Sequence, residues 1–233
     1  MNQATKHREM IEQVALAIGP LLDEMAFVGG CTTGLLLTDS FSKEHVRHTD
    51  DVDLIIHVVG HVGWASLQKQ LRAQGFRNEI SGDDPICAMK LGQLRVDFMP
   101  DDVQLLGFSN RWYAEALQCA EKYQLTEEVT IRLVQPAHFV ATKLEAYLGR
   151  GNGDPLGSRD IEDILSLFDG RDTLVEELAH ASPALRNYVG EQFHKLLDDR
   201  NFEFAVKSAA FGDPDREALI FERLTEAARG APQ

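Results

Sequence analysis

The most constraining feature of the sequence is the stretch 27–56, FVGGCTTGLLLTDSFSKEHVRHTDDVDLII. From Thr49 onward polar and apolar residues alternate, which predicts a strand whose successive side chains point to opposite faces. Asp51 and Asp53 would project together, while the apolar residues between and after them point into a core. Neighbouring carboxylates repel one another unless a cation neutralises them. Mg2+ (or Mn2+) is a usual partner of oxygen-only ligands, so the pattern predicts a metal site.

A second feature of this stretch is the pair Gly29-Gly30, which follows a short apolar strand, 26–28, and precedes a run of helical character, 32–38. Glycine lets the backbone come close to a ligand because it has no Cβ. The helix N-terminus, with Thr32, would offer free N–H groups and a positive dipole end to an anion. Phosphate at the glycines and metal at the aspartates together describe a site for an NTP with its Mg2+.

The order Gly29-Gly30, then Asp51-Val52-Asp53, resembles the signature of the nucleotidyltransferase superfamily, which includes DNA polymerase β and the minimal nucleotidyltransferases. The resemblance implies a third metal-binding carboxylate on a later strand, and Asp97, in the alternating run 94–99, is the candidate. The long spacing between the glycines and the aspartates looks most like the AbiEii-type toxin-like branch. In that branch an arginine and a serine or threonine precede the aspartates, as Arg47 and Thr49 do here.

The same branch implies a lysine and an aspartate from later motifs. Lys143 lies in the matching stretch, and Asp163, with Asp160 close behind it, follows on the next helix. Lys143 would neutralise charge on the nucleotide as the transition state forms. Arg47 would contact phosphate, or it would be an ordinary loop arginine on an acidic surface.

Three of these residues also have a plain structural interpretation. Asp97 would be an acid of an edge strand in a salt bridge with Arg95 or Lys90. Lys143 would be a solvated lysine, and Asp160 an acid that favours a helix N-terminus. The combination of a glycine turn, two aspartates on the next strand and a third strand aspartate favours the nucleotide-and-metal interpretation.

The rest of the chain predicts an α+β fold: a nucleotidyltransferase-like mixed β-sheet flanked by helices, then a mostly helical C-terminal part. A boundary near 135 would divide a catalytic domain, 1–135, from a helical domain, 136–233. Beyond the elements already described, strands are expected at 52–59, 76–80, 86–91, 94–99 and 129–134, and helices at 5–25, 64–74, 109–123, from Pro136 and from Ser158.

Composition sets the class of protein. The chain has 233 residues, of which 44% are hydrophobic, enough for a real core. No apolar run approaches the roughly 18 residues of a membrane span, and the first ten residues lack a signal-peptide core. The scattered cysteines, Cys31, Cys87 and Cys119, indicate neither a disulfide framework nor a zinc site. We expect a cytoplasmic protein with no membrane partner.

The formal net charge of -14 bears on the acceptor of the reaction. Broad nucleic-acid binders usually carry a basic face, which this charge opposes. We expect a Mg2+-dependent nucleotidyltransferase that moves NMP from an NTP to a hydroxyl. The resemblance implies an RNA acceptor, such as the 3′ end of tRNA, or a protein hydroxyl, with an antitoxin protein as a partner. The alternatives are a small-molecule nucleotidyltransferase of the antibiotic-modifying type and a non-catalytic nucleotide-binding partner protein.

Overall fold

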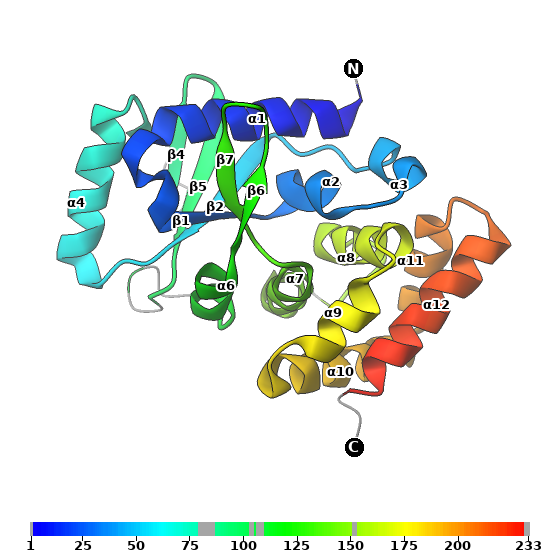
Figure 1. The fold of residues 1–233 in the computed structure, drawn as a ribbon. Coiled ribbons are helices and arrows are strands. Elements are labelled where there is room, and N and C mark those ends of the chain that lie inside the picture. The colour runs from blue at the N-terminus through cyan, green and yellow to red at the C-terminus, as the bar shows by residue number, and fades with distance from the viewer. Residues whose placement is uncertain (1, 79–86, 103–104, 106–109, 151–152, 231–233) are drawn as a thin grey trace. The chain divides into compact units, whose positions relative to one another are not determined.

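The computed structural model describes residues 2–78, 87–102, 105, 110–150 and 153–230. These residues form an α+β protein (Figure 1). The chain divides into two compact units: a sheet unit, Met1–Thr32 with His48–Gln135, and a helical unit, Thr33–Arg47 with Pro136–Gln233. The predicted catalytic domain, 1–135, includes residues 33–47, whereas the structure packs them with the later helices.

One mixed sheet holds the seven strands found in the described part of the chain, in the order β3-β4-β5-β2-β1-β7-β6. β2 and β5 pair in parallel at its centre, β1 runs antiparallel to β2 and parallel to β7, and β4 and β6 form antiparallel pairs with β5 and β7. The strands are β1 Met25–Val28, β2 Asp51–Ile56, β3 Arg77–Asn78, β4 Ala88–Leu91, β5 Leu94–Pro100, β6 Glu121–Gln124 and β7 Thr130–Leu133.

The two central strands alternate in burial as their sequence predicts. In β2, Val52 and Leu54 are fully buried while Asp51 and Asp53 are partly exposed. β5 repeats the pattern, since Val96 and Phe98 are fully buried while Arg95 and Asp97 are partly exposed. The short β4–β5 connection is a hairpin, because the residues that flank its two-residue turn are paired. Alternation therefore puts the polar residues of both strands on a common face.

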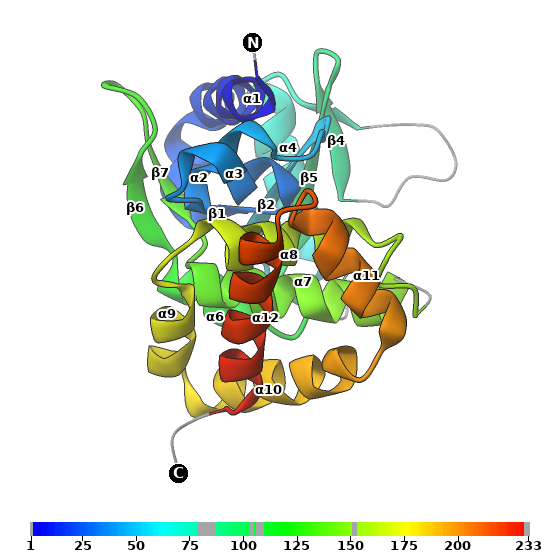
Figure 2. The same cartoon turned by 90° about the vertical axis from the view of Figure 1, so that its right-hand side faces the viewer.

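The helices of the sheet unit begin with α1, Gln3–Ile18, which the side chain of Asn2 caps. The helix expected at 5–25 ends earlier, because α1 gives way at Gly19-Pro20 to the 3-10 turn Gly19–Glu24. α1 contacts β2, and α6 contacts β1 and β2. Figures 1 and 2 both show α1 running across one side of the sheet unit. The remaining helical segments of this unit are η2 Gly30–Thr32, α4 Gly60–Ala73 and α6 Tyr113–Cys119.

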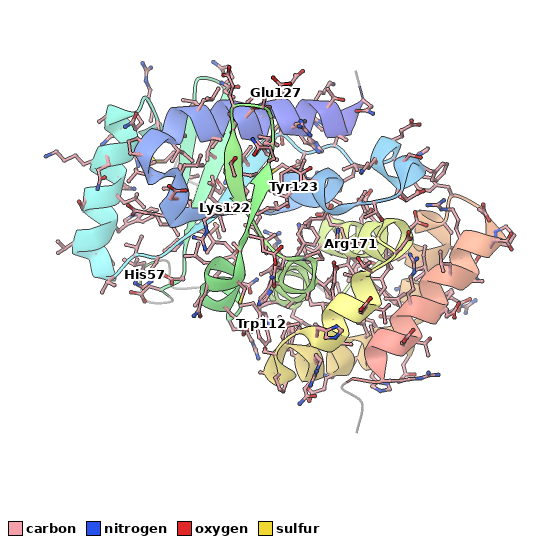
Figure 3. All side chains as sticks on the ribbon, in the orientation of Figure 1. His57, Trp112, Lys122, Tyr123, Glu127 and Arg171 are labelled. Carbon is pink, nitrogen blue, oxygen red and sulfur yellow. The ribbon has the colours of Figure 1, made fainter. Side chains whose placement is uncertain are left out.

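The expected helix at 109–123 is wrong over its last third. In the described residues the helix is only α6, and β6 follows it and pairs antiparallel with β7. Lys122 and Tyr123, labelled in Figure 3, lie on this strand opposite Arg132 and Ile131. Cross-strand pairing overrides the weak helical character of so short a segment.

Other boundaries also differ. β2 ends at Ile56 rather than at 59, and the helical run expected at 32–38 is the short α2, Thr33–Leu36, preceded by η2. The expected strands 76–80 and 86–91 are seen as β3 and β4, which exclude Phe76 and Cys87, while residues 79–86 lie outside the described residues.

In the helical unit, α8 is the central element: it contacts α2, α3, α7, α11 and α12. Figure 2 shows α12 crossing in front of α8. The predicted helix starts are confirmed, with α7 beginning at Pro136 and the side chain of Ser158 capping α8. The helices of this unit are α2, α3 Ser40–Glu44, α7 Pro136–Arg150, α8 Arg159–Gly170, α9 Leu174–His180, α10 Pro183–Leu197, α11 Arg200–Ala209 and α12 Pro214–Ala228.

Backbone contacts explain why residues 33–47 belong to the helical unit. The amides of Thr38 and Asp39 both donate to the carbonyl of Gly170, at 2.8 and 2.9 Å. A Cβ on Gly170 would lie 2.6 Å from the hydroxyl oxygen of Ser42, so α3 packs on α8 only because this residue is glycine. None of the described helices is long and apolar enough to cross a membrane.

Candidate functional site: an acidic triad and a buried ion-pair network

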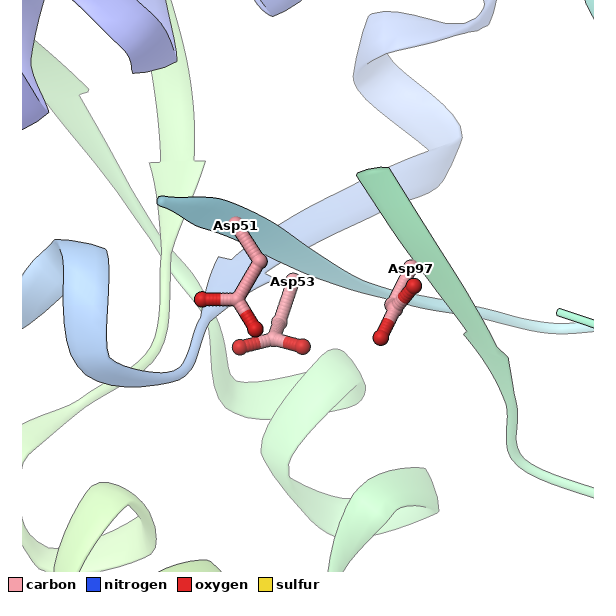
Figure 4. A group of neighbouring side chains, drawn as sticks. All are labelled: Asp51, Asp53 and Asp97. Atoms are coloured by element: carbon pink, nitrogen blue, oxygen red, sulfur yellow. The ribbon is translucent and has the colours of Figure 1, made fainter. Parts of the chain in front are cut away.

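Three carboxylates gather on one face of the sheet. Asp51 and Asp53 project from β2 and Asp97 from β5, toward the same side (Figure 4). In the parallel pairing of these strands Asp53 lies opposite Asp97. One oxygen of each carboxylate lies within 4.8 Å of the others. Partly exposed oxygen ligands so close together fit a hard divalent ion such as Mg2+ or Mn2+.

Gly29 makes room for one of these carboxylates. Its φ is +80°, and a Cβ at this position would lie 2.6 Å from Cγ of Asp53 and 2.8 Å from its Cβ, with a carboxylate oxygen closer still. Real side chains cannot approach so closely, so the position of Asp53 depends on the missing side chain of Gly29. The first glycine of the pair thus contacts a metal-ligand candidate directly.

The turn after Gly29 is closed by Thr32. Both the amide and the hydroxyl of Thr32 donate to the carbonyl of Gly29, at 3.1 and 2.8 Å. Gly30 and Thr32 are buried in the 3-10 turn η2. The phosphate contact of Thr32 stays a prediction, and it would require these bonds to break.

Thr49 restrains Asp51, the other carboxylate of β2. Its hydroxyl donates to Oδ1 of Asp51, and its amide donates to Nε2 of the buried His7 at 3.3 Å. The threonine that the family resemblance singled out therefore lies directly beside the triad. Its hydroxyl restrains the carboxylate without adding charge.

Asp97 is bonded to Arg95, two residues earlier on the same strand. Nε of Arg95 lies 3.0 Å from Oδ1 and Nη2 lies 3.2 Å from Oδ2, a two-point pair. Asp97 thus has both the expected salt bridge with Arg95 and a place in the triad, but the edge-strand interpretation is wrong, because β5 lies between β4 and β2. Arg95 also lies opposite Asp51 on β2 and opposite Lys90 on β4.

The negative charge of the triad affects the pKa of the thiol of Cys87. Burial first, and then the charges of Asp97 and Asp53, raise the pKa of Cys87 to about 12. The cysteine is therefore a neutral thiol at physiological pH and a poor nucleophile. The two carboxylates contribute to this raised pKa even though the charge of Arg95 opposes them.

The second cluster of predicted residues lies in the helical unit and centres on Lys143. The interpretation of Lys143 as a solvated lysine is wrong, since the residue is only 6% exposed. Nζ lies 2.7 Å from Oδ2 of Asp163 and 3.1 Å from Oδ1 of Asp160. Burial disfavours the charged form, but the two carboxylates outweigh it and raise the pKa of Lys143. The lysine is a fully charged member of a buried network.

Asp163 joins residues from three segments of the helical unit. Nε and Nη2 of Arg47 each lie 2.8 Å from one of its oxygens, and the hydroxyl of Thr33 donates to it at 3.4 Å. Arg47 is therefore neither a free loop arginine nor, in this structure, a free phosphate ligand. Its predicted contact with phosphate stays a prediction.

Asp160 is the outer carboxylate of the same network. Arg150 contacts both of its oxygens at 3.0 Å, and Lys143 contacts one. Burial raises the pKa of Asp160, but Lys143 and Arg150 lower it below its usual value overall. Its place near the start of α8 is as predicted, yet it is ion-paired rather than a simple helix-terminal acid.

The structure thus groups the predicted residues in two sets. The triad, Gly29 and Thr49 meet in the sheet unit, whereas Arg47, Lys143, Asp160 and Asp163 meet in the helical unit. Sequence reasoning treated Arg95 only as a rival explanation of Asp97 and missed Thr33. The i,i+2 spacing of Arg95 and Asp97 on a predicted strand was the available signal for the first, since such residues share a face.

No protein-family model matches the sequence, and no curated protein proves similar to it. A functional assignment therefore depends on the motif residues and on their geometry.

Proposed function

We propose that the protein is a Mg2+- or Mn2+-dependent nucleotidyltransferase, with a sheet of the nucleotidyltransferase type, that transfers NMP from an NTP to a hydroxyl group. The observation that carries the proposal is the meeting of Asp51, Asp53 and Asp97 on one face of two parallel central strands. Three carboxylates within reach of one ion repel one another, and the guanidinium of Arg95 offsets only one of their three charges. The apolar residues that alternate with these aspartates on the two strands are fully buried, so the positions of the aspartates are well defined.

In this proposal Asp51, Asp53 and Asp97 hold the divalent ions. Bound ions would balance the triphosphate charge and lower the pKa of the acceptor hydroxyl. Asp97 would accept the proton of that hydroxyl. Gly29 would keep Asp53 in place, and Thr49 would do the same for Asp51.

The helical unit holds an ion-pair network of its own, and the motif resemblance assigns a phosphate contact to its lysine and arginine. Among the mutually bonded charges of its network, Arg47, Lys143 and Arg150 face Asp160 and Asp163, so three cations oppose two carboxylates. A local excess of positive charge in an acidic protein favours a phosphate group. Lys143 and Arg47 would have to share their carboxylate partner with it, whereas Arg150, with a side chain 73% exposed, is open to solvent.

Two acceptor classes follow from the proposal. The motif resemblance favours an RNA hydroxyl, such as the 3′ end of tRNA. The net charge of -14 favours a small-molecule hydroxyl, because it repels polyanions. A protein that only holds nucleotide would need no third carboxylate, which makes the non-catalytic alternative weaker.

A transfer assay tests the proposal. The protein is incubated with each α-32P-labelled NTP, Mg2+ and deproteinised total RNA, beside the double variant Asp51→Ala, Asp53→Ala. Asp50→Ala is the matched control, since Asp50 is an exposed aspartate next to the site. Label on a discrete RNA, lost in the double variant and kept in the control, would establish RNA nucleotidyl transfer and identify the nucleotide.

Two other results are informative. NTP binding that depends on Mg2+, without labelled RNA, would direct the search to small-molecule and protein acceptors. Absence of any NTP binding by the wild-type protein would refute the enzyme proposal.

A further inference from the structure

A cation of the protein itself is already bonded to the acidic triad. Arg95 and Asp97 form a two-point ion pair that uses both oxygens of the carboxylate. The parallel register of β2 and β5 sets Arg95 opposite Asp51 and Asp97 opposite Asp53. The four residues therefore form a square on one sheet face, with carboxylates at three corners and a guanidinium at the fourth.

The charges of this square sum to two negative units, from three carboxylates and one guanidinium. Without the arginine, the three carboxylates would repel one another whenever the metal is absent. A divalent ion that binds Asp97 meets a competing cation in Arg95 and is repelled by its charge. The arginine thus stabilises the metal-free protein and weakens the hold on the metal.

The exposure of the two side chains favours release of the pair. The side chain of Arg95 is 36% exposed, whereas that of Asp97 is 13% exposed. The long arginine can leave toward solvent by rotating about its side-chain bonds, while the short aspartate is fixed to its strand beside the other carboxylates.

We propose that Arg95 is a built-in counter-cation of the metal site, which holds Asp97 while no metal is bound and gives it up to an arriving divalent ion. This role rests on the metal site of the proposed function, though not on the identity of the acceptor. Arg95 would thereby set the concentration of free metal at which all three carboxylates become available to the ion.

A purely positioning role for Arg95 makes the opposite prediction. Carboxylates that bind metals are often held in orientation by hydrogen bonds from neighbours, and loss of such a neighbour weakens metal binding. If Arg95 competes with the metal, its removal tightens binding instead. The sign of the change therefore separates the two roles.

The test measures Mn2+ binding without nucleotide, by calorimetry and by the electron paramagnetic resonance signal of free Mn2+. The full chain is compared with Arg95→Gln, Arg95→Lys and Arg72→Gln. Arg72 is the matched control, because it belongs to the same unit but bonds Asn78 instead of the triad. Melting temperatures are recorded in EDTA and in saturating Mn2+.

We expect Arg95→Gln to bind Mn2+ at least about tenfold more tightly than the wild type, from the removal of a unit charge several ångströms from a doubly charged ion. Its melting temperature should fall in EDTA, and Mn2+ should raise it by more than in the wild type. Arg95→Lys keeps the charge but loses the two-point pair, so it should bind Mn2+ more tightly by a smaller factor. Arg72→Gln should bind as the wild type does.

Equal or weaker Mn2+ binding by Arg95→Gln would overturn the counter-cation role and leave the metal site standing. If that variant does not fold even with Mn2+, Arg95→Lys decides by the same criterion. The wild type could also show no Mn2+ binding that is lost in the double variant Asp51→Ala, Asp53→Ala. That result would refute both the proposed function and the role of Arg95.

Discussion

Gly29→Ala offers a sharp test of how the sheet holds Asp53. The substitution places a methyl group 2.6 Å from Cγ of Asp53 and 2.8 Å from its Cβ, and it puts an alanine at a φ of +80°. The left-handed backbone costs about 1–2 kcal/mol for a residue with a Cβ. Overpacking adds about 1–3 kcal/mol. We expect the free energy of unfolding to fall by about 2–5 kcal/mol in total, and Mn2+ binding to be lost because Asp53 must move.

A matched glycine separates the two costs. Gly92 has a φ of +63°, but a Cβ there would meet nothing within 4 Å. Gly92→Ala should therefore show only the backbone cost of about 1–2 kcal/mol, with Mn2+ binding unchanged. The difference between the two variants gives the cost of the clash with Asp53.

The assay is urea unfolding followed by circular dichroism in EDTA, with Mn2+ titration of the folded variants. In an Asp53→Ala background the nearest clashing atoms are gone, so Gly29→Ala should cost less than in the wild type. A Gly29→Ala protein as stable as Gly92→Ala and with wild-type Mn2+ affinity would refute the reasoning, because Asp53 would then not depend on Gly29.

Two further predictions concern the helical unit. Lys143→Met leaves two buried carboxylates without a shared cation and should lower the free energy of unfolding by about 3–5 kcal/mol, whereas Arg150→Met, with an exposed side chain, should cost less than about 1 kcal/mol in the same urea titration. Equal costs would contradict the central place of Lys143 in the network. Hydrogen bonds from the amide and hydroxyl of Ser42 lower the pKa of Asp39 from 3.8 to about 2. Asp39 therefore contributes stability that is fully present above its unfolded pKa and is lost as the pH falls from about 4 to 2; Asp39→Asn should flatten the stability profile over that interval, and an unchanged slope would contradict it.

The sequence predicts the sheet side of the candidate site well, and for a simple reason. Period-two alternation places Asp51, Asp53 and Asp97 on one face, and the pairing of β2 with β5 brings the strands together. The sequence could not show that Gly29 lies against Asp53, because that contact depends on the three-dimensional path of the turn. It also did not reveal β6, whose four residues become a strand only through pairing with β7.

The helical network was harder to predict because its members come from distant segments. The family resemblance implied that Lys143 and Asp163 both serve the site, but it gave no sign that Arg47 would bond Asp163 across more than a hundred residues. Residues 33–47 pack on α8 in the helical unit, although the residues before and after them belong to the sheet unit. No local sequence pattern predicts this. Long-range packing decides it, through contacts such as that between Gly170 and Ser42.

The two acidic clusters differ in a way that makes the triad the better candidate for a metal ion. In the helical unit Asp163 is bonded to Lys143 and Arg47, and Asp160 to Lys143 and Arg150, so the protein's own cations balance both carboxylates. At the triad, Arg95 bonds Asp97, and the neutral hydroxyl of Thr49 bonds Asp51.

Three carboxylates at the triad face one bonded guanidinium, which leaves two negative charges uncompensated. After burial, the charges of Asp97 and Asp53 also raise the pKa of Cys87. An added divalent ion therefore gains most at the triad and would have to displace bonded cations in the helical network. We accordingly expect Asp53→Asn to abolish stabilisation by Mn2+ and Asp160→Asn to leave it in place, as measured by melting temperature with and without the ion. Loss of the metal response in Asp160→Asn alone would place the ion in the network instead.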